Sequence, residues 1–207
     1  MRATRTISNL VVGALLLFAP GHPNAQQNAP AARATSPDDL PTIRLLRNPD
    51  PVPDFRVRDL DGNLLSPADF QGKVVLLTFW ATWCGPCRAE VPDLIALQNR
   101  YGGKLQVIGL AVDDGPEEEV RSFVRARHIN YPVAIVPEEV QNKFGGVHGL
   151  PTMFLLDSRG RVVQRHIGLR DPVLYDMEIR ALLGMPVQAH VETFEDNGQI
   201  FLRNSLR

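Results

Sequence analysis

Residues 74–87 read VVLLTFWATWCGPC, and this stretch decides the fold of the chain. Its first half, Val74–Trp80, is an apolar run typical of a strand that is buried on both faces. After the second cysteine, apolar residues recur at helical spacing as far as Arg100, and the glycines at 102 and 103 end that helix. The sequence therefore predicts a buried strand followed by a helix, with Cys84 at their junction.

The two cysteines of the chain, Cys84 and Cys87, lie on a single helical turn. A disulfide that closes so short a loop restricts the unfolded chain by only about 2 kcal/mol, so its main use is to open and close. Free backbone N–H groups and the helix dipole stabilise a thiolate at Cys84, whereas Cys87 should be more buried. We therefore expect Cys84 to attack a partner disulfide and Cys87 to resolve the mixed disulfide.

Half of a zinc site is the alternative use of two cysteines at this spacing. A structural zinc site needs four ligands, usually including a second pair of cysteines or histidines. The histidines show no paired ligand spacing: His22, His128, His148, His166 and His190. The sequence therefore favours a redox pair over zinc.

Residues 83–87, WCGPC, match the active-site pentapeptide of thioredoxins, and Pro92 matches the proline that kinks their active-site helix. Residues 149–152, GLPT, match their cis-proline loop. The chain thus resembles the thioredoxin superfamily, which implies a cis bond before Pro151 in a loop facing the cysteines. The resemblance also implies a substrate-binding frame around the sulfurs: Trp83, Gly85, Pro86, Leu150 and Pro151.

Over roughly residues 51–184 the chain is most similar to TlpA/ResA-like thiol–disulfide oxidoreductases. Thr78 replaces the buried aspartate that thioredoxins usually carry before the first cysteine. Glu90 stands where TlpA/ResA-like proteins have a buried glutamate, and helical spacing places it on the face of Cys87. We expect Glu90 to be catalytic and to take the Cys87 proton; the alternative is a first-turn carboxylate that favours the helix dipole.

The order of elements predicts an α/β, thioredoxin-like fold with a central mixed sheet flanked by helices and an N-terminal β-hairpin extension. Around the hairpin signal Asp61-Gly62 lie Phe55–Leu60 and Leu64–Leu65. The further strands are expected at Gln106–Val112, Pro132–Val136, Thr152–Leu156 and Arg161–Ile167. The further helices are expected at Pro116–Arg127, at Glu138–Phe144 and from a cap at Asp171 to Leu183.

Four segments are expected along the chain. Residues 1–25, with basic, apolar and small-residue parts, are typical of a secretory signal peptide; an uncleaved anchor is the alternative because Pro23 fits a cleavage site poorly. Residues 26–50 are expected to be a flexible linker and residues 51–185 the thioredoxin-like domain. Residues 186–207 form a C-terminal extension, in which His190–Phe194 and Gln199–Leu202 flank an Asn-Gly signal for a β-hairpin.

These features together predict a periplasmic thiol–disulfide oxidoreductase that needs no cofactor. The net charge of −1, from 22 basic and 23 acidic residues, gives no indication of a nucleic-acid partner, and a monomer is expected. Gly85-Pro86 between the cysteines resembles thioredoxin, whose potential of about −270 mV favours reduction. The resemblance implies exported substrate proteins, such as apocytochrome c in cytochrome c biogenesis or copper-assembly proteins, and a membrane electron donor.

Two other functions share these residues. A copper-binding chaperone would use Cys84 and Cys87 with His148 as a third ligand, because thiolate and imidazole both suit copper. A thiol peroxidase would instead need a single peroxidatic cysteine in a Thr-x-x-Cys setting. The sequence therefore disfavours a thiol peroxidase more strongly than a copper-binding chaperone.

Overall fold

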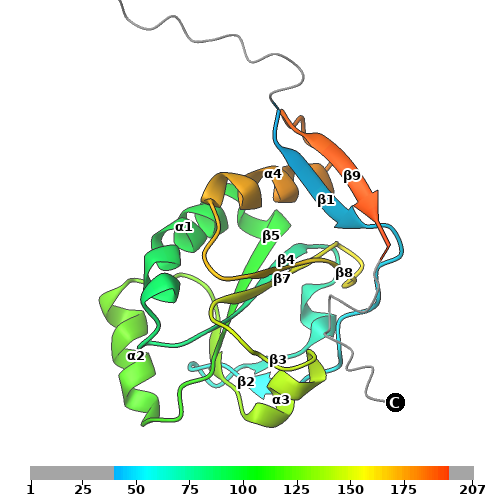
Figure 1. Cartoon of the computed structure of the whole chain (residues 1–207). Coiled ribbons are helices and arrows are strands. Elements are labelled where there is room, and N and C mark those ends of the chain that lie inside the picture. The colour runs from blue at the N-terminus through cyan, green and yellow to red at the C-terminus, as the bar shows by residue number, and fades with distance from the viewer. Residues whose placement is uncertain (1–39, 196–207) are drawn as a thin grey trace, which may run out of the picture. The chain divides into compact units, whose positions relative to one another are not determined.

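The structure is a computed structural model that describes residues 40–195 (Figure 1). The signal peptide or anchor expected at residues 1–25 lies outside the described residues, as do residues 26–39 of the expected linker. So does Gln199–Leu202, the second arm of the expected C-terminal hairpin. Within residues 40–195, no helix combines the length and apolar character that a membrane span requires.

A five-stranded mixed sheet forms the centre of the domain, in the order β6-β5-β4-β7-β8. Its strands are β4 (Val74–Trp80), β5 (Leu105–Ala111), β6 (Val133–Ile135), β7 (Thr152–Leu156) and β8 (Val162–Ile167). β4 is parallel to β5 and antiparallel to β7, and every residue of β4 is buried. The prediction of a central mixed sheet around this strand is confirmed.

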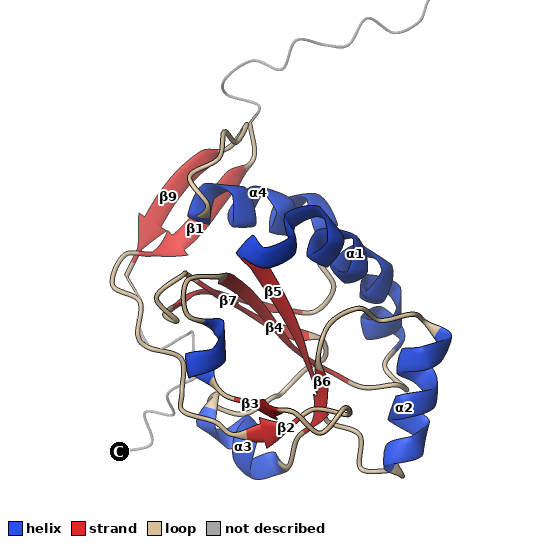
Figure 2. Ribbon diagram, turned by 180° about the vertical axis from the view of Figure 1, so that it is seen from behind, coloured by secondary structure: helices blue, strands red, loops and turns tan. Residues whose placement is uncertain are grey.

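Helices cover both faces of the sheet, so side chains of β4 enter two separate cores (Figure 2). The helices are α1 (Gly85–Tyr101), α2 (Glu117–Ala126), α3 (Glu138–Lys143) and α4 (Pro172–Leu182). Val74, Leu76 and Trp80 pack on the side of α1, α2 and α4. Val75, Leu77 and Phe79 pack on the other side, with α3. This double coverage explains why the β4 sequence is apolar without alternation.

The predicted N-terminal hairpin is present as β2 (Val57–Arg58) and β3 (Leu64–Leu65), which pair antiparallel. Asp59 shapes the turn, because its carboxylate accepts hydrogen bonds from the backbone N–H groups of Asp61 and Asn63. Gly62 has a φ of 87°, which glycine adopts without strain. The hairpin signal in the sequence therefore reflects real turn chemistry.

The linker prediction is wrong for part of its length. Residues Thr42–Leu46 form β1, which pairs in parallel with β9 (His190–Phe194). Ile43 is fully buried, and the Gln164 side chain on β8 donates a hydrogen bond to the Arg44 carbonyl. The strand at His190–Phe194 was expected, but within residues 40–195 its partner is β1. Composition alone missed β1 because its partner strand comes from the far end of the domain.

Candidate active site

Cys84 and Cys87 form a disulfide at the start of α1. Cys84 is the N-cap residue with extended backbone angles, and the backbone N–H of Cys87 donates to its sulfur at 3.2 Å. Pro86 lies in the first turn, where its missing N–H costs no helical hydrogen bond. The structure thus places Cys84 at the strand-to-helix junction, where N–H groups and the helix dipole favour a thiolate.

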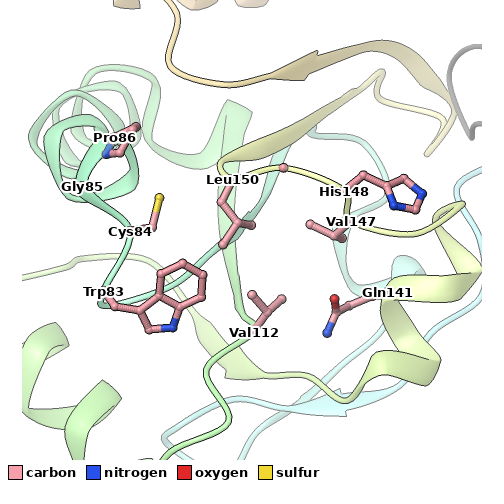
Figure 3. A pocket seen from close by; sticks show the side chains of 10 residues that line it. Trp83, Cys84, Gly85, Pro86, Val112, Gln141, Val147, His148 and Leu150 are labelled. Carbon is pink, nitrogen blue, oxygen red and sulfur yellow. The ribbon is translucent and has the colours of Figure 1, made fainter.

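A cavity of about 530 Å³ opens beside this helix end (Figure 3). Its lining includes Cys84 but not Cys87, which is only 2% exposed. Trp83, 66% exposed, stands at its edge. The other lining residues are Gly85, Pro86, Val112, Gln141, Val147, His148, Gly149 and Leu150. A partner entering the cavity would therefore meet the sulfur of Cys84 first.

The cis-proline loop forms the opposite wall of the cavity. The Leu150–Pro151 peptide bond is cis, as the resemblance implied. Gly149 and Leu150 line the cavity, while Pro151 is buried directly before β7. The Thr152 hydroxyl donates to the Gly149 carbonyl at 2.7 Å and so fastens the loop to the strand. Of the expected substrate-binding frame, all members but Pro151 line the cavity.

His148 does not join the sulfur pair. Its ring points away from Cys84 (Figure 3). The ring lies close to Gly146 instead, since a Cβ atom placed on Gly146 would be 2.9 Å from Nε2 of His148. Throughout residues 40–195, no group of three histidine, cysteine or acidic residues is arranged to hold a metal ion. The geometry therefore gives no support to the copper site considered from sequence.

Glu90 lies inside the domain on α1, where its side chain is 2% exposed. The hydroxyl of Tyr175 donates a hydrogen bond to its Oε1 atom at 2.8 Å. Burial is the main cause that raises the pKa of Glu90 to about 7, and the nearby Asp93 acts in the same direction. No acidic residue occupies the first turn of α1, so the dipole-capping alternative for Glu90 is not supported.

Thr78, which replaces the usual thioredoxin aspartate, is also buried. Its hydroxyl oxygen has no hydrogen-bond partner among the described residues. A threonine at this place cannot take up a proton at physiological pH. Of these two buried side chains, only Glu90 can therefore exchange a proton in that pH range.

Sequence reasoning missed three buried residues behind Glu90. Tyr175 and Glu178 come from α4, and His166 comes from β8. Both carboxylate oxygens of Glu178 lie 3.0 Å from Nε2 of His166. The rings of His166 and Tyr175 meet edge to face, with centroids 5.6 Å apart. The sequence did carry one signal for this cluster. Tyr175 and Glu178 are polar residues three positions apart, on the face of the α4 helix that packs into the core.

The sequence model of the Redoxin family matches residues 47–178. "Thioredoxin-like protein YneN" of Bacillus subtilis (strain 168) is 36% identical over 119 residues, covering 56% of this chain and 69% of its own length. "Thiol-disulfide oxidoreductase ResA" of Bacillus thuringiensis subsp. konkukian (strain 97-27) is 41% identical over 114 residues, covering 55% of this chain and 65% of its own.

Solved structures agree with the sequence comparison. A putative "Thiol:disulfide interchange protein DsbE" from Chlorobium tepidum superposes with a TM-score of 0.62 at 34% identity, covering 67% of this chain and 99% of its own. A putative thioredoxin from Neisseria meningitidis superposes with a TM-score of 0.60 at 29% identity, covering 66% of this chain and 92% of its own. The chain therefore belongs to the Redoxin family, in the TlpA/ResA-like group of thiol–disulfide oxidoreductases of the thioredoxin superfamily.

Proposed function

We propose that the protein reduces disulfides of exported proteins in the periplasm through a Cys84/Cys87 dithiol–disulfide cycle. The observation that carries the proposal is the disulfide at the start of α1, of which only Cys84 lines the cavity. Family membership and the cis-proline loop opposite the sulfur support the same chemistry. The DsbE and ResA names of its relatives also refer to thiol–disulfide chemistry.

In the proposed cycle, the Cys84 thiolate attacks one sulfur of the partner disulfide. The partner S–S bond breaks, its other sulfur leaves as a thiolate, and a mixed disulfide joins the partner to Cys84. Glu90 takes the proton of Cys87, and the Cys87 thiolate then attacks Cys84. This second exchange releases the reduced partner and restores the Cys84–Cys87 disulfide, so two electrons pass to the partner. A membrane dithiol donor then reduces the Cys84–Cys87 disulfide and so supplies two new electrons.

The side chains that line the cavity support an extended peptide as the bound form of the substrate. Trp83 and Leu150 flank the sulfur with apolar surface, and Gln141 adds a polar group across the cavity (Figure 3). An oxidised, still unfolded chain can present such a segment around its cysteines. Apocytochrome c and copper-assembly proteins are the two substrate classes we propose, on the resemblance to TlpA/ResA-like proteins.

The activity can be measured with a purified test protein that contains one reducible disulfide. The wild-type protein, recycled by a dithiol, should accelerate its reduction, because Cys84 supplies a thiolate stabilised by the helix end. The matched control is the Cys84→Ser/Cys87→Ser variant, which keeps the cavity and loses both sulfurs. Equal rates with and without the cysteines would contradict the proposed function.

The proposed compartment has its own test. A fusion of residues 1–50 to a reporter that is active only outside the cytoplasm should give signal, because the basic, apolar and small-residue order favours export. Replacing Leu15 and Leu16 with arginine in the fusion interrupts the apolar stretch and should abolish that signal. Reporter protein that stays in the cytoplasm would refute the periplasmic assignment.

A further inference from the structure

We propose that Tyr175 is a positioning residue for Glu90: its hydroxyl fixes the carboxyl group for proton uptake from Cys87, and the His166–Glu178 pair holds Tyr175 in place. The inference rests on the proposed function, in which Glu90 is the proton acceptor. It extends the site from α1 to α4 and β8, two elements that carry no cysteine.

Tyr175 on α4 contacts Glu90 on α1 directly. Tyr175 is fully buried, and its hydroxyl lies 2.8 Å from Oε1 of Glu90. A phenol that donates to a carboxylate stabilises the charged form and restricts rotation of the carboxyl group. The hydrogen bond to Oε1 therefore holds the Glu90 carboxyl group in one orientation.

Tyr175 is held in place by two buried neighbours, Glu178 and His166. Tyr175 and Glu178 lie one turn apart on α4, and Glu178 binds His166 with both oxygens. The His166 and Tyr175 rings pack edge to face. A buried polar pair such as His166 and Glu178 is weak support for stability, because apolar residues of similar volume usually stabilise a core as well or better. Its position behind Tyr175 is explained if the pair orients the tyrosine.

The groups that face Glu90 have opposing effects on its pKa. Burial and Asp93 on α1 raise this pKa, while the Tyr175 hydrogen bond and His166 on β8 lower it. Tyr131, which precedes β6, also faces Glu90, whose charge contributes to the raised pKa of that phenol. Tyr175 and His166 thus oppose the effect of burial and bring the carboxyl into the range useful for a general base.

The remaining groups near the site do not change this direction. The pKa of Tyr175 itself is raised, by burial first and then by Glu90, with Glu178 contributing as well. Arg170, beyond β8, acts weakly on Tyr175 in the opposite direction. The tyrosine therefore stays protonated, and remains a hydrogen-bond donor, throughout the working pH range.

The test replaces Tyr175 with phenylalanine, which keeps the ring against His166 and removes only the hydroxyl. Two readouts are needed: the carboxyl titration of Glu90 by carbon NMR in the oxidised protein, and the rate at which a preformed mixed disulfide on Cys84 is resolved between about pH 5 and 9. Loss of the hydrogen bond to the charged carboxylate should move two midpoints upward by about one pH unit: that of the Glu90 titration and that of the pH dependence of the resolution rate.

Tyr101→Phe is the matched control. Tyr101 lies on α1 and donates to Asp176 on α4 at 2.6 Å, so its loss removes another tyrosine hydrogen bond between the same two helices. Neither midpoint should move in this variant. An equal shift in Tyr101→Phe and Tyr175→Phe would show a general loosening of the helices and overturn the inference.

A double variant separates failure of this inference from failure of the proposed function. In a Glu90→Gln background, Tyr175→Phe should have no further effect on the resolution rate, because the tyrosine acts only through the carboxyl. An unchanged Glu90 titration in Tyr175→Phe overturns the role of Tyr175. If the pH profile of resolution is also unchanged in Glu90→Gln alone, the proposed role of Glu90 fails as well. Thermal unfolding verifies that each variant is folded before the two readouts are compared.

Discussion

Replacing Cys84 with serine is expected to abolish disulfide exchange, and replacing Cys87 with serine is expected to turn the protein into a trap for its partners. Only Cys84 lines the cavity, and it lies at the helix end that stabilises a thiolate. Without Cys87, the mixed disulfide on Cys84 has no internal thiol to resolve it. The same geometry predicts that Cys84 alone reacts rapidly with alkylating reagents in the reduced protein.

Non-reducing electrophoresis of extracts from the native compartment measures the trapping. Cys87→Ser should accumulate mixed disulfides that disappear on reduction, while Cys84→Ser and the double variant should not. Loss of so short a disulfide loop costs about 2 kcal/mol in the chain-entropy picture, so the variants should still fold, which thermal unfolding verifies. Mass spectrometry of the trapped partners would decide between apocytochrome c and copper-assembly proteins. Equal trapping by both single variants would refute the separate roles.

The active-site core of this domain could be predicted because its signals are local. Val74–Trp80 is apolar on both faces since two helical layers cover it, and the cysteine motif follows directly. The burial of Glu90 followed from its spacing to Cys87 on one helix together with the family resemblance. In each case the determinant of the structure lies within one or two turns of the residue itself.

The features that sequence reasoning missed depend on contacts between distant segments. Strand β1 exists because β9 supplies its hydrogen bonds, and a composition rich in proline and polar residues concealed it. Tyr175 reaches Glu90 from α4, across a separation of 85 residues. His166 showed no partner at ligand spacing because the residue that it contacts is Glu178 on α4. Periodicity shows that a residue faces the core, but it does not show which residue it meets there.

The oxidised protein is expected to become more stable above neutral pH when Glu90 is replaced by glutamine. Burial raises the pKa of Glu90 from its ordinary 4.5 to about 7 in the folded protein. Between these values the folded state holds a proton that the unfolded state has released, so the free energy of unfolding falls as pH rises. The loss is complete above about pH 7 and amounts to about 3 kcal/mol for a shift of this size. Glutamine keeps an oxygen for the Tyr175 hydroxyl and does not titrate.

Urea unfolding of the oxidised proteins from about pH 4 to 8.5 measures this effect across the window between the unfolded and folded pKa values. Wild type and Glu90→Gln should have similar stability at the acidic end and diverge as pH rises, with the variant the more stable by up to about 3 kcal/mol. Glu192→Gln, at an exposed site on β9, is the matched control and should follow the wild type.

The same substitution should act in the opposite direction on catalysis. Once Cys84 has formed a mixed disulfide, Glu90→Gln should slow its resolution, because the amide cannot take the Cys87 proton. Attack by Cys84 should change less, since the helix end stabilises its thiolate independently of Glu90. A residue that lowers stability at neutral pH and accelerates one chemical step is retained for that step. If Glu90 had only a structural role, Glu90→Gln would lower stability and leave the resolution rate unchanged. Parallel stability curves together with unchanged resolution rates would refute both the buried charge and its role as the proton acceptor.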